Sequence, residues 1–165
     1  MSLRALRLWT KHMKREFVVT AASITVLSII VVGSIFARQN GKQIVGLTAE
    51  QIRWFTPSYY NDGRQRAQLL GDSTKGGMWV DRVRIPGGGR VLAHTHSQDE
   101  QVTVIQGTWY LGEGQESDAN KLRSYPAGSF IIIPAGVPHF AEAKDGPVIV
   151  QLSGRGKFAT HYLGK

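Results

Sequence analysis

Three of the five histidines in this chain lie in two short motifs framed by glycine, and the first motif most constrains the fold. It reads Gly88-x5-His94-x-His96-x3-Glu100-x6-Gly107. Successive side chains of an extended strand alternate between its two faces, so His94 and His96 are expected to project from the same face. The carboxylate of Glu100 follows closely enough to join both imidazoles at one divalent cation. The motif therefore predicts a strand with a metal-binding face.

A second motif lies downstream and reads Gly128-x5-Pro134-x-Gly136-x2-His139. Its central segment is expected to form a turn, because glycine accepts a positive φ and proline stiffens the approach. The turn would return His139 to the first motif. His139 would then supply a fourth metal ligand from a distant strand.

Together the two motifs resemble the bipartite signature of the cupin superfamily, in its small single-domain, RmlC-like form. The first motif matches at every fixed position and the second matches through His139, but the asparagine usual four residues later is Ala143. The resemblance covers residues 78–154. It implies an all-β fold, a double-stranded β-helix or jelly-roll barrel with two sheets of four or five strands. By analogy with many cupins, it also implies a homodimer.

The predicted metal ligands are His94, His96, Glu100 and His139. They would leave about two positions of a six-coordinate ion for water, oxygen or substrate. Fe, Mn, Ni, Zn and Cu are all compatible with this donor set, so the sequence predicts a divalent transition metal without choosing one. The alternative is a barrel without metal, in which His94 and His96 are hydrogen-bonded polar residues.

Three nearby polar residues need separate treatment. Gln151, on a late predicted strand, is the candidate substrate-binding residue. Gln101 is expected outside the site, because strand alternation places it opposite Glu100. His161 has no partner at ligand spacing and is expected on the surface.

Two functions fit these features. The first is a metal-dependent enzyme of the oxygenase or isomerase type that acts on a small organic molecule, with the metal as Lewis acid or oxygen activator. No second inward carboxylate is evident, so such a reaction would depend on the metal. The second is a non-catalytic module at the membrane surface that binds or senses a metal or small ligand.

The charge distribution argues against a nucleic-acid partner. The chain carries a net charge of +8, but residues 1–42 hold seven basic residues and one acidic residue. The remainder holds thirteen basic and eleven acidic residues, so it is nearly neutral. Basic clusters with interleaved aromatic residues, which mark a nucleic-acid surface, are missing from that remainder.

The N-terminal region has the pattern of a membrane or export segment. A basic leader, residues 1–16, precedes an uncharged apolar run, residues 17–37, which as a helix would span about 30 Å. The excess of basic residues before the run places the N-terminus in the cytoplasm. The run is either an uncleaved inner-membrane anchor, with the following domain in the periplasm, or a cleaved signal that releases a secreted protein. Residues 38–46 form a linker and residues 47–165 the barrel domain.

The rest of the chain predicts one short helix followed by strands. The segment 47–52 contains a capping box, in which Thr48 and Gln51 exchange hydrogen bonds. Beyond it, short apolar runs are separated by glycine, proline and aspartate, as in β-sandwiches and barrels. The expected strands are 67–70, 78–85, 90–95, 101–105, 108–111, 129–133, 139–143 and 148–153.

Overall fold

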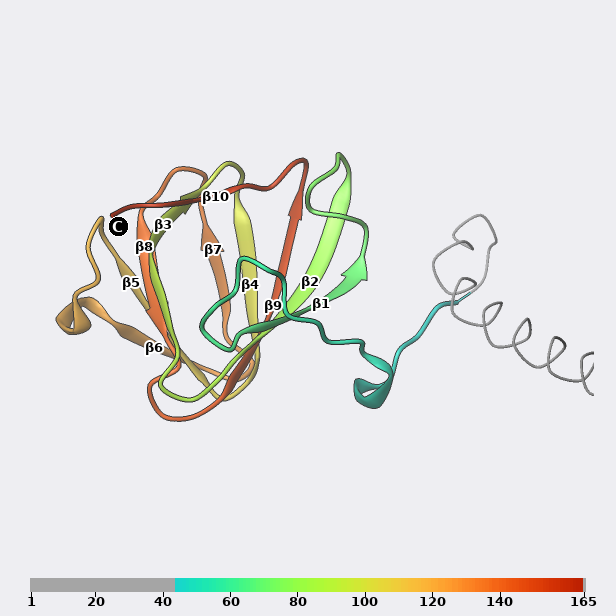
Figure 1. The fold of residues 1–165 in the computed structure, drawn as a ribbon, viewed down its shortest axis with the longest axis horizontal. Helices are drawn as coiled ribbons and strands as arrows, with labels where there is room; N and C mark the ends of the chain where they lie inside the picture. Colours follow the sequence, from blue (N-terminus) through green and yellow to red (C-terminus); the bar gives the residue numbers. More distant parts are fainter. Residues whose placement is uncertain (1–43, 165) are drawn as a thin grey trace, which may run out of the picture. The chain divides into compact units, whose positions relative to one another are not determined.

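The short strands assemble into two antiparallel five-stranded sheets in the computed structural model, which describes residues 44–164. The first sheet has the order β1-β2-β9-β4-β7 and the second the order β10-β3-β8-β5-β6. The sheets face each other across the core, as Figure 1 shows. The strands of the first sheet are β1 (Gln65–Leu70), β2 (Met78–Ile85), β4 (Glu100–Gln106), β7 (Phe130–Ile133) and β9 (Val148–Arg155). Those of the second are β3 (Arg90–His96), β5 (Thr108–Glu113), β6 (Arg123–Pro126), β8 (His139–Glu142) and β10 (Thr160–Tyr162).

Alternation along the strands separates the core from the outer surface. In β2, the residues at every second position from Trp79 to Ile85 are buried, and the residues between them are more exposed. Val102 and Val104 of β4 are each only 1% exposed. Gln101, the neighbour of Val102 in the same strand, is exposed on the outer face. The inward side chains of both sheets form one hydrophobic cluster, whose burial stabilises the fold by about 25 cal/mol per Å² of apolar surface.

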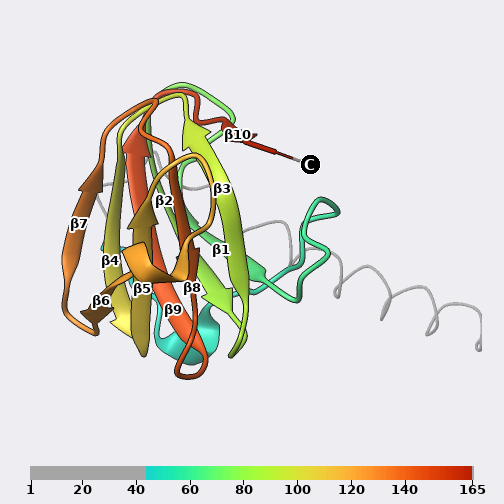
Figure 2. The ribbon, with the colours of Figure 1, turned by 90° about the vertical axis from the view of Figure 1, so that its left-hand side faces the viewer.

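The chain passes repeatedly from one sheet to the other. From β2 onward, consecutive strands change sheet at β2–β3, β3–β4, β4–β5, β6–β7, β7–β8, β8–β9 and β9–β10. Only β5 and β6 follow each other within one sheet after this point. Figure 2 shows the resulting double-layered jelly roll from its side. The repeated crossings bring motifs that are distant in sequence to one end of the barrel.

All eight predicted strands are present, but two strands were missed. β6 is a four-residue polar edge strand, and β10 is a three-residue strand with every residue exposed. Neither carries the apolar alternation that marks a strand in sequence. The predicted helix at 47–52 is a single 3-10 turn, η1 (Ala49–Gln51), in which the backbone N–H of Thr48 donates to Oε1 of Gln51 at 2.8 Å. A second 3-10 turn, η2 (Ala119–Lys121), precedes β6.

The predicted leader and apolar run, residues 1–37, lie outside the described residues. Within residues 44–164, no helix has the length and apolar character needed to cross a bilayer.

Candidate metal centre

Strand register places the three motif histidines together. His94 of β3 and His139 of β8 are direct cross-strand partners, and their ring centroids are 4.2 Å apart. His96, two residues along β3, contributes a ring 4.7 Å from that of His94 and 5.0 Å from that of His139. Each histidine offers a ring nitrogen to a group whose members all lie within 4.8 Å of one another. All three residues are buried.

An irregularity in β3 turns the two histidines inward. The register between β3 and β8 shifts between Val91 and His94. Val91 lines the interior, and strict alternation from it would send His94 to the outer face. The extra residue of the bulge changes the phase, so that Val91, His94 and His96 all face the interior.

Hydrogen bonds to the outer nitrogens orient two of the rings. Nδ1–H of His94 donates to the carbonyl of Leu92 at 2.6 Å, and Nδ1–H of His139 donates to the carbonyl of Val137 at 2.9 Å. These contacts assign the Nδ1–H tautomer, which leaves each Nε2 lone pair for a cation. Such second contacts commonly fix both the tautomer and the orientation of a metal-binding histidine.

His96 is held by the last strand. Its Nδ1 lies 3.2 Å from Oγ1 of Thr160 in β10, and the hydroxyl can donate or accept. Its Nε2 lies 3.1 Å from Nε2 of His94. Two lone pairs at this distance repel each other, whereas a cation between them, or a proton on one ring, relieves the repulsion.

Glu100 approaches the cluster from the opposite sheet. It begins β4, and its Oε2 lies 3.6 Å from Nε2 of His96. The carboxyl group is buried, and this burial raises its pKa from 4.5 to about 8. The three-histidine group does not include it, so Glu100 adjoins the cluster through His96. A cation beside it would favour the carboxylate form.

Burial also sets the charge of the histidines. Burial, with the neighbouring His139, lowers the pKa of His94 from 6.5 to about 4. Burial, with His94 and His139, lowers the pKa of His96 from 6.5 to about 3. Burial lowers the pKa of His139 as well. All three rings are therefore neutral at pH 7, the form in which imidazole binds metals.

Turn contacts tie the second motif to the first. Gly136 has φ 76°, the positive value expected for this turn. Its N–H donates to the carbonyl of His96 at 2.9 Å, and the N–H of Ala135 donates to Oδ1 of Asp99 at 2.8 Å. Ala143, in place of the usual asparagine, is fully buried, and its backbone exchanges hydrogen bonds with the Gly88–Gly89 turn. The substitution therefore lies at the barrel edge, away from the histidines.

A cavity of about 380 Å³ opens between the sheets beside the cluster. Its apolar lining comprises Trp79, Val83, Ile85, Val91, Val102, Trp109, Leu111, Ile133, Ala141, Val150, Leu152 and Phe158. Its polar lining, besides the histidines and Glu100, comprises Tyr59, Tyr60, Arg64, Arg66, Ser73, Thr74, Thr160 and Tyr162. Within residues 44–164, Glu100 is the one carboxylate of this lining.

The three other residues singled out in the sequence lie apart from the cluster. Gln151 is not in the cavity lining: Val150 and Leu152 take the inward positions of β9, and Oε1 of Gln151 accepts a hydrogen bond from Nε of Arg82 at 3.1 Å. The expectation that Gln151 points inward is thus corrected. Gln101 and His161 are exposed, as expected.

Several cavity residues carry no signal in the sequence. Arg64 and Arg66 precede or begin β1, outside both motifs, and the aromatic Tyr162 belongs to a strand that was not expected. Tyr162 faces His94 in register, with ring centroids 5.5 Å apart. The pairing of β10 with β3 places Tyr162 there. A strand of three residues is too short to show a periodic pattern in the sequence, so this pairing could not be predicted.

The donor set fits a transition-metal ion. Ligand nitrogens at about 2.1 Å from one ion lie up to about 4.2 Å apart, close to the spacing of the three ring nitrogens. Three neutral imidazoles with a carboxylate alongside suit divalent iron, manganese, nickel, copper or zinc. His94, His96 and His139 would hold the ion, and Glu100 is placed to join them.

An antiparallel two-sheet barrel with a histidine cluster inside it defines a jelly-roll protein that can bind a metal. The chain belongs to the cupin family, since the family model described as Cupin matches residues 67–157. This range includes both motifs and eight of the strands from β2 onward.

Solved structures show the same fold. The polyketide cyclase RemF from Streptomyces resistomycificus superposes with a TM-score of 0.62 at 12% identity, over 74% of this chain and 87% of the other. A sugar phosphate isomerase of the cupin superfamily from Silicibacter pomeroyi gives 0.55 at 24% identity, over 72% and 81%. An RmlC-like cupin from Ralstonia eutropha gives 0.54 at 19% identity, over 72% of each chain. The comparison with curated proteins gave no match.

Proposed function

We propose that this chain is a metal-dependent enzyme of the oxygenase or isomerase type that acts on a small organic molecule. The observation that carries the proposal is the group of three buried histidines on the wall of an internal cavity. A cavity of about 380 Å³ is in the range of small-molecule sites in proteins. A structural metal would not require such a space beside it, whereas a working metal site needs room for substrate.

The protein residues have separable roles in this proposal. A bound divalent metal would supply Lewis acidity or oxygen activation. His94, His96 and His139 would hold the ion through neutral rings, and His94 and His139 would bind it through Nε2. Glu100 is a buried acid that holds a proton at Oε in the absence of a cation and gives it up when one binds. The apolar lining excludes water and strengthens every electrostatic contact within the cavity.

Metal content and turnover test the proposal. The purified full-length chain would be loaded separately with Fe(II), Mn(II), Ni(II), Cu(II) or Zn(II), and metal per chain measured by elemental analysis. Oxygen consumption and product formation would then be followed with a panel of small organic acids, enols, phenols and sugars. Stoichiometric metal with turnover that His139→Ala abolishes supports the proposal. A full metal site without turnover on any of these substrates contradicts the enzymatic part.

One observation favours a second candidate, a non-catalytic module that binds or senses a small ligand. Within residues 44–164, Glu100 is the one carboxylate of the cavity, and it adjoins the histidines. The described cavity thus offers no second carboxylate as a general base. In this alternative, ligand binding would change a partner contact, and crosslinking in membranes with and without zinc would detect a metal-dependent partner.

Attachment to the inner membrane is a further part of the proposal. It rests on the apolar run at residues 17–37 and the basic leader before it. The barrel would then lie in the periplasm, or be secreted if the run is cleaved. Fractionation of cells, with the mass of the mature chain, distinguishes an anchored, a secreted and a cytoplasmic protein.

A homodimer is proposed through the outer face of the first sheet. Phe130 and Ile132 of the edge strand β7 are 58% and 59% exposed, and exposed apolar side chains at a sheet edge favour association. Light scattering of wild type and of a Phe130→Ser, Ile132→Ser double variant would measure the mass. A monomeric wild type contradicts this part.

A further inference from the structure

Arg64 is a buried cation on the cavity wall, and only some of its N–H donors have an acceptor. Its side chain is 10% exposed. Nε–H donates to Oδ2 of Asp62 at 2.8 Å, and one Nη2–H donates to the hydroxyl of Tyr162 at 3.2 Å. A guanidinium has five N–H groups, so three of them have no acceptor within residues 44–164. Arg64 lines the cavity and none of its nitrogens is a buried atom without a partner, so these N–H groups are open to a cavity ligand.

The orientation of this guanidinium is fixed before any ligand arrives. Its central carbon lies 4.2 Å from the ring centroid of Tyr60, in a cation–π contact. Asp62 and Tyr162 hold it from two further sides. Because the fork is already ordered, an anion that binds to it costs little additional side-chain entropy.

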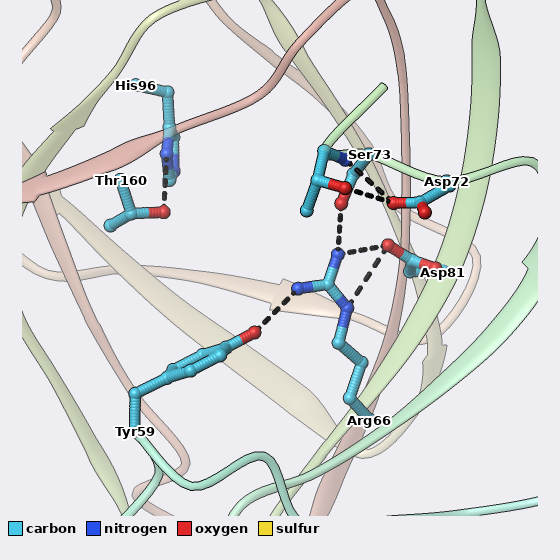
Figure 3. A network of polar contacts seen from close by, with 8 residues as sticks. Tyr59, Arg66, Asp72, Ser73, Asp81, His96 and Thr160 are labelled. Carbon is cyan, nitrogen blue, oxygen red and sulfur yellow. Dashed lines mark hydrogen bonds and ion pairs between the residues drawn. The ribbon is translucent and has the colours of Figure 1, made fainter. Parts of the chain in front are cut away.

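A second guanidinium supports the same wall but is nearly saturated. Figure 3 shows Arg66 bonded to Asp81, Ser73 and Tyr59. Its Nε–H donates to Oδ2 of Asp81 at 3.1 Å, Nη2–H to Oγ of Ser73 at 2.8 Å, and Nη1–H to the hydroxyl of Tyr59 at 3.1 Å. Arg66 therefore positions the surrounding hydroxyl groups, and Arg64 keeps the open donors.

The cavity presents positive charge to its contents. Arg64 and Arg66 both belong to its lining, but their carboxylate partners Asp62 and Asp81 do not. A cationic ligand would leave these donors unmatched, and a neutral acceptor would bind them more weakly than an anion does.

The aromatic and aliphatic residues of the lining favour an apolar body for the rest of the ligand. Trp79 and Phe158 are packed against each other with ring centroids 4.7 Å apart, and Phe158 also stacks on His96 at 4.4 Å. Trp109 and several aliphatic side chains complete the apolar wall. Flat apolar groups gain the most from such surroundings.

We propose that the cavity takes a small organic anion, a carboxylate on a flat apolar body, and that Arg64 binds the carboxylate while the body extends toward the histidine cluster. The inference deepens the proposed function and rests on it for the identity of the site. It makes Arg64 the residue that decides between anionic and neutral ligands.

Benzoate and benzamide are suitable probes, because they share a shape and differ in charge. Their affinities for the full-length chain in detergent would be measured by calorimetry, both after chelator treatment and after zinc loading. We expect benzoate to bind at least about tenfold more tightly than benzamide, the margin of a charge-assisted hydrogen-bond pair. Equal affinities, or no benzoate binding at millimolar concentration, would overturn the inference without any variant.

Two variants locate the effect. Arg64→Gln should weaken benzoate about tenfold and leave benzamide unchanged. Arg84→Gln is the matched control, because Arg84 also lies 4.2 Å over an aromatic ring, that of Trp54, and donates to Oε1 of Gln65 outside the cavity lining. Equal losses in the two variants would overturn the assignment to Arg64.

Metal content, measured on the same samples, separates this inference from the proposed function. Benzoate preference in a protein that takes up none of the five metals would contradict the proposed function and support the anion site. Metal uptake with no preference for benzoate would overturn the anion site and leave the proposed function in place.

Discussion

The backbone N–H of Gly136 donates to the carbonyl oxygen of His96 at 2.9 Å. This bond joins the turn of the second motif to the end of the strand that carries the first. Since His139 follows the turn by three residues, the bond fixes the distance between the two halves of the metal centre. The positive φ of 76° at Gly136 is the backbone conformation that makes it available.

Gly136→Ala should therefore destabilise the barrel and weaken metal binding together. A left-handed conformation costs a non-glycine residue about 1–2 kcal/mol, although no atom would meet the new Cβ within 4 Å. We expect the unfolding midpoint of the metal-free protein to fall by a few degrees, as measured by circular dichroism. Gly76→Ala is the control, because Gly76 has open space and no positive φ. Equal midpoints for the two variants would contradict the argument.

Removal of a ligand histidine should abolish stoichiometric metal binding. His94→Ala and His139→Ala each leave two imidazoles, and we expect the affinity for Zn(II) to fall at least about 100-fold. Competition with a chromophoric chelator measures this. His161→Ala should bind as the wild type does, because His161 is exposed on β10 and outside the group. A comparable loss in His161→Ala would show that the wrong histidines have been assigned.

Thr160 should tune the metal site through His96. Thr160→Val keeps the shape of the side chain but removes the hydroxyl that lies 3.2 Å from Nδ1 of His96. Loss of such an outer contact typically weakens metal affinity about 10–100-fold. The same chelator competition would detect it. Thr103→Val, on the outer face of β4, should have no effect, and an unchanged affinity in Thr160→Val would mean that the hydroxyl does not orient the ring.

Metal binding should release about one proton near pH 6.5, and the proton should come from Glu100. The pKa of this carboxyl is raised to about 8, so it is protonated before the ion arrives. The pKa values of His94 and His96, lowered to about 4 and about 3, make those rings neutral already. Calorimetry in buffers of different ionisation enthalpy counts the proton. Glu100→Gln should release none, and the same count in both proteins would exclude Glu100 as the source.

The metal-free barrel should lose stability as pH rises from about 6.5 to about 8, where the histidines no longer oppose the effect of Glu100. Over this window the folded state keeps a proton on Glu100 that the unfolded chain has released, so the free energy of unfolding falls with pH. The histidines act in the opposite direction, because their lowered pKa values remove stability as pH falls below 6.5. Above pH 6.5 the Glu100 effect remains alone. Urea unfolding at several pH values should show the decline in wild type and a flatter profile in Glu100→Gln; a parallel decline in both would refute it.

The two motifs predicted the fold because each fixed residue has a local structural cause. Gly136 indicates a turn, and the spacing of His94 and His96 indicates a strand. The short segment between His96 and Glu100 is the connection from β3 in one sheet to β4 in the other. Three histidines were therefore grouped correctly. The inward direction of His94, however, depends on the bulge after Val91, and alternation alone does not contain it.

The rest of the cavity could not be predicted, because its residues meet only through long-range pairing. Arg64 reaches Tyr162 across 98 positions of sequence, and neither belongs to a periodic pattern. The inward direction expected for Gln151 was wrong because side chains alternate along β9, and the sequence does not say which alternate set faces inward. Val150 and Leu152 face the cavity, so Gln151 between them faces away from it.

The pairing of β10 with β3 sets an order of assembly. His94 and His96 precede His139 and Thr160, the residues that complete their surroundings, in the order of synthesis. A chain without β10 has all three histidines but lacks Thr160 beside His96 and Tyr162 beside His94. Because contacts between residues so distant in sequence form slowly, we expect the three rings to meet before Thr160 and Tyr162 hold two of them in place.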